Sequence, residues 1–79
     1  MYKELLEYIA KNLVTNADNI EVTEEKLDNK LVLRLKVQKE DMGRVIGKEG
    51  RIIRSIREII SAYAGKNSER VVVEIEEIK

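Results

Sequence analysis

The chain has 79 residues, with 15 Lys and Arg against 15 Asp and Glu, so its formal net charge is zero, and it contains neither cysteine nor histidine. A chain of this length predicts a single domain spanning residues 1–79. The missing residue types exclude disulfides and thiolate metal sites and remove the commonest general base and zinc ligand, so we expect no enzyme, metal or cofactor. We also expect a cytoplasmic protein, because the sequence shows neither a signal-peptide pattern nor an apolar run of membrane-spanning length.

The charges are distributed unevenly along the chain. Residues 1–29 hold three Lys and Arg against seven Asp and Glu, residues 30–57 hold nine against three, and residues 58–79 hold three against five. A basic middle segment between acidic ends indicates an anionic partner for that segment.

The first half of the chain predicts a helix followed by a β-hairpin. Apolar residues recur three and four positions apart over residues 2–14, which is typical of an amphipathic helix: Tyr2, Leu5, Leu6, Ile9 and Leu13. The alternation of residues 20–24 and 31–38 predicts two strands, and Asp28-Asn29 between them predicts the turn. Four residues of the second strand should point to the core: Leu31, Leu33, Leu35 and Val37.

The second half predicts two helices and a last strand. A short helix, with Met42, Val45 and Ile46 on its apolar side, should end at Gly47, and a longer one should run from Gly50 or Arg51 to about Ala64, with Gly65 as its C-cap. The buried stripe expected on the longer helix is wide: Ile52, Ile53, Ile56, Ile59, Ile60 and Tyr63. Its exposed side should carry Arg51, Arg54 and Arg57, which lie three residues apart. The last strand places Val71, Val73 and Ile75 toward the core, so the order is α-β-β-α-α-β, an α+β fold with three helices on one face of a three-stranded sheet.

The turn between the two later helices has the chemistry of a phosphate site. Gly47 and Gly50 carry no Cβ that would hold a sugar-phosphate backbone away, and the second helix begins with unpaired N–H groups. Lys48 adds a positive charge within the turn, whereas Glu49 opposes binding of an anion. The glycine spacing by itself fits a sharp turn between helices equally well.

The longer string Val45-Ile46-Gly47-Lys48-Glu49-Gly50-Arg51-Ile52-Ile53-Arg54-Ser55-Ile56 resembles the signature of KH domains, a V-I-G-x-x-G-x-x-I run between two helices. The element order matches the prokaryotic, type II form of that family. Residues 43–50 and 70–75 are also similar to small stand-alone bacterial KH proteins of the KhpA kind.

This resemblance implies binding of single-stranded RNA with low sequence specificity, in the manner of an RNA chaperone or post-transcriptional regulator. By position, the clamp on the RNA backbone would be Gly47, Lys48, Glu49 and Gly50. The candidate groove wall would be Gly43, Arg44, Ile46, Arg51, Ile53 and Arg54, and the loop around residues 66–70 would close the other side. The absence of Phe and Trp is consistent with low specificity, because base stacking on aromatic side chains is then scarce.

Other interpretations of these residues remain open. Gly43 could serve only close helix packing, and Ile46 and Ile53 could be ordinary core residues. The alternative function is a protein-interaction adaptor with little or no RNA binding, which forms a homodimer, or a heterodimer with another KH protein, through isoleucines such as Ile59 and Ile60 that one small sheet does not cover.

Overall fold

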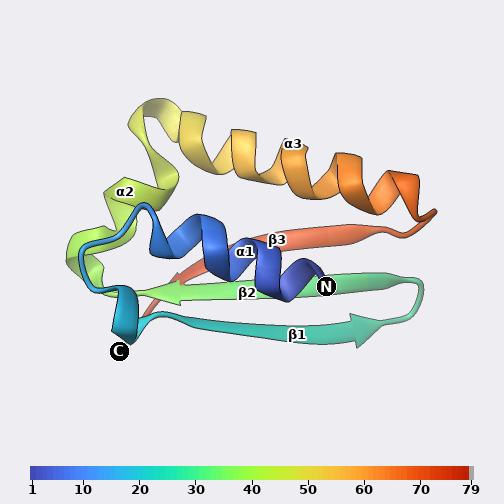
Figure 1. Ribbon diagram of the computed structural model, residues 1–79, viewed down its shortest axis with the longest axis horizontal. Coiled ribbons are helices and arrows are strands. Elements are labelled where there is room, and N and C mark those ends of the chain that lie inside the picture. The colour runs from blue at the N-terminus through green and yellow to red at the C-terminus, as the bar shows by residue number, and fades with distance from the viewer. Residues whose placement is uncertain (79) are drawn as a thin grey trace.

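The computed structural model describes residues 1–78 and confirms the predicted α-β-β-α-α-β order (Figure 1). Helices and strands have these bounds: α1 (Tyr2–Lys11), β1 (Glu21–Leu27), β2 (Lys30–Val37), α2 (Met42–Ile46), α3 (Arg51–Lys66) and β3 (Val71–Glu77). The three helices lie on one face of the sheet, as expected for an α+β KH domain (Figure 1). Within residues 1–78, no helix is long and apolar enough to cross a membrane.

The sheet has the order β1-β2-β3, with β2 in the centre. β1 and β2 form the predicted antiparallel hairpin, in which Asp28 takes the positive φ of 51° that the tight turn needs. β2 and β3 run parallel, with Leu31 opposite Val71, and a parallel pair needs a long crossover. Residues 38–70 form that crossover. It contains α2, α3 and the turn between them, which lie along one side of β3.

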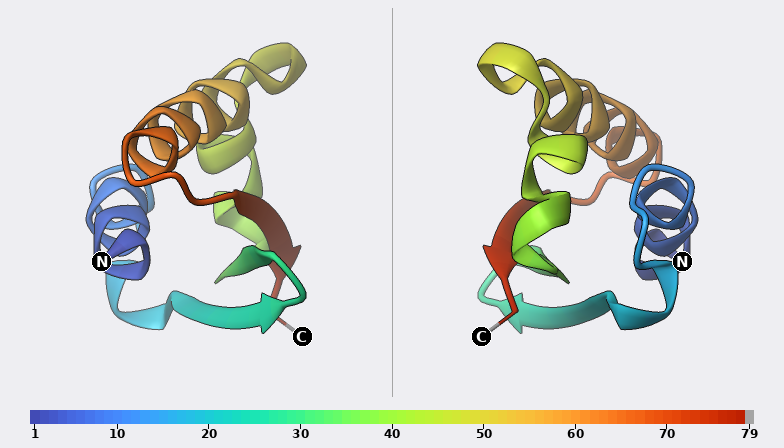
Figure 2. Two further views of the ribbon diagram at one scale, coloured as in Figure 1. Left: turned by 90° about the vertical axis from the view of Figure 1, so that its right-hand side faces the viewer. Right: turned by 90° about the vertical axis from the view of Figure 1, so that its left-hand side faces the viewer.

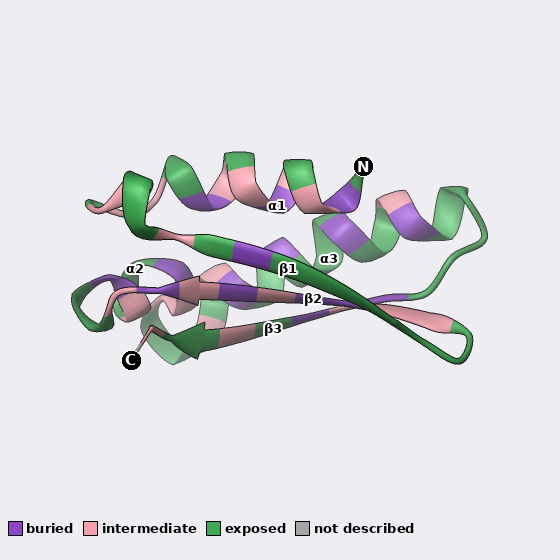
Figure 3. Ribbon diagram, turned by 90° about the horizontal axis from the view of Figure 1, so that it is seen from below, coloured by how far each residue is buried: buried purple, intermediate pink, exposed green. Residues whose placement is uncertain are grey.

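The core lies between the sheet and the helices. β2 supplies its centre, because Leu33, Leu35 and Val37 are completely buried. The helices cover these side chains with residues that recur every three or four positions, shown as purple bands in Figure 3: Leu6 and Ala10 of α1, and Ile53, Ile56, Ile60 and Ala64 of α3. A domain this small buries only about 60–65% of its unfolded surface, so each of these residues matters for stability.

Several sequence-based expectations were wrong in detail. The first helix ends at Lys11 instead of residue 14, and residues 12–14 continue as a turn bonded to the carbonyls of Ile9 and Ala10. Gly65 is not a C-cap, because α3 continues to Lys66 and the positive φ falls on Ser68. Ile59 is 51% exposed and not part of the buried stripe, since α3 rests on the sheet through a narrower face than its apolar residues suggested.

Arg34 joins all three strands on the outer face of the sheet. Arg34 of β2 reaches Glu25 of β1 at 2.7 Å and Glu74 of β3 at 3.1 Å. This arginine is therefore engaged by carboxylates of both neighbouring strands.

Candidate nucleic-acid interface

The turn between α2 and α3, residues 47–50, is called the GKEG loop from here on. Three of its four residues have positive φ: Gly47 at 78°, Glu49 at 57° and Gly50 at 75°. Backbone of this kind is common only for glycine, and a non-glycine residue there carries a steric penalty. The loop is therefore a strained, compact connection that exposes its main chain between two helix ends.

The two glycines are required for different reasons. A Cβ on Gly47 would lie 2.6 Å from Cγ1 of Ile52 and 2.9 Å from its backbone nitrogen, and the φ and ψ of Gly47, 78° and 172°, are essentially restricted to glycine. A Cβ on Gly50 would meet nothing closer than 3.9 Å, so only its left-handed backbone, at 75° and 17°, disfavours a side chain. Gly47 thus maintains the packing of the loop on α3, whereas the space beside Gly50 is open.

The charged residues of the loop divide into free and engaged groups. Lys48 is exposed and, among residues 1–78, makes no ion pair within 4.0 Å. Arg54 donates from Nη2 to the backbone carbonyl of Glu49 at 2.9 Å and so supports the strained turn. The Glu49 carboxylate lies 3.9 Å from Nη2 of Arg51, the first residue of α3. Both side chains are about 70% exposed, so this pair is weak.

A groove of about 380 Å³ lies between α3 and β3. Its walls are Arg57, Ser61 and Ala64 of α3, residues 69–70 of the following loop, and residues 71–73 of β3. β3, which forms one wall of this α3–β3 groove, lies on the side of α3 away from α1 (Figure 2). The sequence had predicted Arg57 only as part of an exposed row, and neither Ser61 nor β3 was expected at the site.

The edge of β3 that borders the groove carries backbone polar groups. The carbonyl of Arg70 accepts a hydrogen bond from N of Leu31, toward β2. Since alternate residues of a strand direct their backbone groups to opposite edges, Val71, Val73 and Ile75 direct theirs away from β2. One is occupied, because Nε of Arg57 donates to the carbonyl of Val73 at 3.2 Å. The groove therefore combines an apolar floor with donors and acceptors suited to the edge of a base.

Residues 3–75 match the family model described as KhpA/KhpB, KH domain. The chain belongs to the KhpA/KhpB family of KH domains. An RNA-binding protein KhpA from Clostridium acetobutylicum is 53% identical over 73 residues, which cover 92% of this chain and 97% of the relative. RNA-binding protein KhpA from Aquifex aeolicus is 44% identical, with 92% of each chain covered.

Solved structures of the protein Era share the fold of this KH domain. A structure of Era in complex with MgGDPNP and nucleotides 1506–1542 of 16S ribosomal RNA aligns with a TM-score of 0.63 at 19% identity. An Aquifex aeolicus Era structure aligns with the same TM-score at 17% identity. In both, the alignment covers 96% of this chain but only 29% of the Era chain, so the likeness concerns one part of Era.

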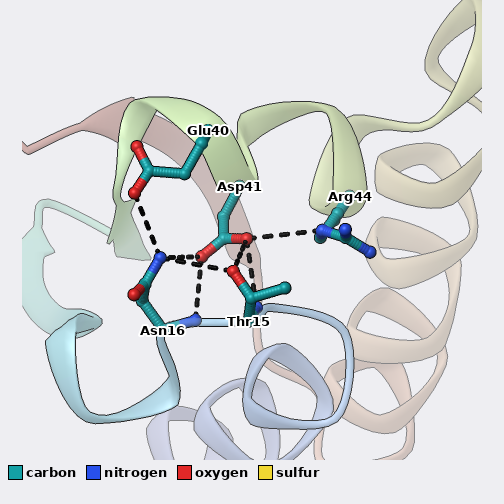
Figure 4. A network of polar contacts seen from close by, with 5 residues as sticks. All are labelled: Thr15, Asn16, Glu40, Asp41 and Arg44. Carbon is teal, nitrogen blue, oxygen red and sulfur yellow. Dashed lines mark hydrogen bonds and ion pairs between the residues drawn. The ribbon is translucent and has the colours of Figure 1, made fainter.

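The start of α2 in this KH domain is fixed by a buried carboxylate (Figure 4). Asp41, fully buried, accepts hydrogen bonds from the backbone and hydroxyl of Thr15, at 3.0 and 2.8 Å, and from N and Nδ2 of Asn16, at 3.0 and 3.1 Å. These donors, that of the Thr15 backbone first, lower the pKa of Asp41 to about 2. The carboxylate thereby joins the turn after α1 to the helix that leads into the GKEG loop.

A second tether holds the other end of the groove. The hydroxyl of Tyr2 donates to Oε1 of Glu69 at 2.6 Å and accepts from Nδ2 of Asn67 at 3.0 Å, and the Glu69 hydrogen bond raises the pKa of Tyr2. Glu69 belongs to the loop between α3 and β3 that closes the groove. Hydrogen bonds from the start of α1 and from the turn that follows it therefore position the loop that lines the α3–β3 groove and the start of α2.

The remaining residues expected at the site differ in how much surface they present. Gly43 is exposed, and a Cβ added there would have nothing within 4 Å, whereas Ile46 is half-buried. Ile53 is only 8% exposed, so it is a core residue and not part of the groove wall. Arg44 is exposed, but its Nε lies 3.5 Å from Oδ1 of Asp41, which draws its charge toward the α1 turn.

Proposed function

We propose that this domain, residues 1–79, binds single-stranded RNA with low sequence specificity, with the backbone held by the GKEG loop and the bases in the α3–β3 groove. The observation that carries the proposal is the glycine loop of positive φ, with an exposed Lys48, at the start of the helix whose later residues Arg57, Ser61 and Ala64 line the groove. The names of the KhpA relatives and the RNA-bound Era structure support the same ligand class.

The loop offers three contributions to phosphate binding. The bare backbone at Gly47 and Gly50 permits close approach, and the exposed Lys48 supplies a positive charge. The positive end of α3 adds to this, although the N–H of Arg51 already donates to the carbonyl of Lys48. Arg51 and Arg54 raise the local potential at the same helix end, although both also interact with Glu49. We therefore assign the clamp to residues 47–50 and assistance to the two arginines.

Low specificity follows from the absence of stacking groups at the groove. Tyr2 and Tyr63 contact each other edge to face, with ring centroids 5.3 Å apart, and Tyr8 is exposed on α1. None of these rings lines the groove among the described residues. Since stacking contributes about 1–3 kcal/mol per base elsewhere, affinity here depends mainly on phosphates and is sensitive to salt.

Such a domain needs neither catalysis nor a cofactor. Weak binding of unpaired RNA with low sequence specificity suits an RNA chaperone or a post-transcriptional regulator in the bacterial cytoplasm. We propose that role for the protein.

The clamp is tested by titrating a fluorescein-labelled single-stranded RNA with the protein and with a Lys48→Asp, Glu49→Asp double variant. Aspartate tolerates the left-handed conformation of position 49 better than most residues, so the variant should fold. The control is Lys3→Asp with Glu4→Asp on α1, which makes the same charge change far from the loop. We expect the loop variant to abolish binding and the control to retain most of it. Equal affinity for wild type and a folded loop variant would refute the clamp.

The adaptor function has one specific observation in its favour. Ile59 exposes 51% of its surface on α3, although a lone exposed isoleucine is common on monomeric proteins. Ile60, which was also expected at such an interface, is completely buried in the core and cannot contribute to it. If Ile59 forms a homodimer, or a heterodimer with another KH protein, sedimentation velocity should show dissociation of the Ile59→Ser variant with its thermal stability unchanged. If the Ile59→Ser variant dissociates, and if the loop variant binds RNA as tightly as the wild type, the adaptor function is favoured over the RNA clamp.

A further inference from the structure

A second depression lies beyond the α3–β3 groove, between the β1–β2 turn and the loop that precedes β3. Its volume is about 340 Å³, and we call it the hairpin depression. Lys26, Lys30 and Leu31 line it from the hairpin, and Ser68, Glu69 and Arg70 line it from the loop. Glu69 and Arg70 also line the α3–β3 groove, so the two hollows are neighbours that share these two residues.

The two walls of the hairpin depression are fixed relative to one another. N of Leu31 donates to the carbonyl of Arg70 at 2.9 Å, which joins the end of the hairpin to the start of β3. Both turns are tight, with positive φ at Asp28 (51°) and at Ser68 (56°). A preformed hollow of this kind costs little reorganisation when it binds a ligand.

The charges available in the depression favour an anion. Lys26, Lys30 and Arg70 make no ion pair within 4.0 Å among residues 1–78, in contrast to Arg34, Arg44 and Arg51. Two acids also line the hollow, and they reduce its net positive charge. Of these, Glu69 already accepts the hydrogen bond from Tyr2, whereas Asp28 lies on the exposed hairpin turn. The half-buried Leu31 adds one apolar surface on which a base could rest.

The position of the depression favours as its ligand an RNA strand that continues from the α3–β3 groove. α3 has 16 residues and therefore extends about 24 Å, with the GKEG loop at its start. The β1–β2 turn and the loop before β3, which line the depression, lie at the far end of α3 (Figure 1). A single strand held by the loop and laid along the α3–β3 groove would leave the groove at Arg70, where the depression begins.

We propose that the hairpin depression binds the phosphates of nucleotides that continue from the groove, so that the RNA footprint exceeds the roughly four nucleotides that a KH clamp holds. Lys26, Lys30 and Arg70 are the residues that contact them. This inference rests on the proposed RNA binding, and it predicts that affinity increases with RNA length until the depression is filled.

The test compares RNAs of four and ten nucleotides, labelled at one end, with the wild-type protein and a Lys26→Gln, Lys30→Gln double variant. The control, Lys3→Gln with Lys11→Gln, also removes two lysine charges, but from α1. We expect the hairpin variant to bind the ten-nucleotide RNA about tenfold more weakly, with a log–log salt slope reduced by about 1.4, because each single-strand phosphate contact contributes about 0.7. Binding of the four-nucleotide RNA should not change.

The outcomes separate this inference from the proposed function. If wild type and hairpin variant bind the long RNA equally, or if the α1 control loses as much affinity, the hairpin depression is not part of the site although RNA binding stands. If the wild-type protein binds neither RNA, the proposed function itself fails.

Discussion

Replacing the glycines one at a time should reveal how the GKEG loop is built. Gly47→Ala forces a residue with a Cβ into φ and ψ of 78° and 172° and places that Cβ 2.6 Å from Ile52. Backbone strain of about 1–3 kcal/mol and overpacking of about 1–3 kcal/mol together predict a loss of roughly 2–6 kcal/mol in the free energy of unfolding. Gly50→Ala should lose only about 1–2 kcal/mol, because its left-handed backbone is the one obstacle to a side chain.

Gly65→Ala is the matched control for this series. Gly65 lies within α3, has no positive φ, and has nothing within 4 Å of the added Cβ. Alanine there should increase the free energy of unfolding by about 0.5–1 kcal/mol, because it lowers the entropy cost of forming the helix.

Urea denaturation followed by circular dichroism gives the free energy of unfolding of each variant. A domain of this size has a total stability of only about 4–12 kcal/mol, so Gly47→Ala should be strongly destabilised or partly unfolded. In thermal melts each kcal/mol corresponds to about 4–8 °C. The reasoning is refuted if Gly47→Ala and Gly50→Ala lose the same stability, or if Gly65→Ala is as harmful as either.

Three further predictions concern the residues around the loop. Because the pKa of Asp41 is lowered to about 2 from an ordinary 3.8, its stabilising effect is complete above about pH 4 and is lost as the pH falls toward 2. Asp18→Asn is the control, because it keeps Asp41. In urea denaturation, Asp41→Asn should be less stable than this control at neutral pH and should lose less stability as the pH falls from about 4 to about 2. Identical acid profiles of the two variants would contradict the role of Asp41. Arg57→Gln should lower RNA affinity and reduce the salt slope by about 0.7, and an unchanged slope in fluorescence titrations would remove Arg57 from the site. Gly43→Ala should raise the free energy of unfolding by about 0.5–1 kcal/mol, since Gly43 is helical and an added Cβ would meet no other atom within 4 Å. The same variant should weaken RNA binding. Unimpaired binding in the same titration would show that RNA does not contact Gly43.

The order of the elements was predictable because each has a clear local pattern. Alternation in β2, the periodicity of α1 and α3, and the hairpin turn at Asp28-Asn29 all determine structure over short distances. The GKEG loop was predictable for the same reason, since its glycines and the apolar residues beside it are contiguous in sequence.

Features that depend on long-range contacts were not predictable. Asp41 has the position of an acidic residue at a helix start, but its carboxylate is satisfied by Thr15 and Asn16, more than twenty residues earlier in the chain. Arg57 became a groove residue only because the crossover brings β3 alongside α3. Ile59 has the spacing of a core residue, and only the width of the sheet determines that it stays exposed.

The most direct test of the central claim is a ¹H–¹⁵N NMR titration of the protein with a short single-stranded RNA. We expect the largest amide shifts at residues 47–51, around the GKEG loop, and at residues 70–73, which line the α3–β3 groove. Shifts on α1 should be small. Large shifts confined to α1 and to the exposed face of α3 around Ile59, with residues 47–51 unmoved, would contradict RNA binding by the GKEG loop.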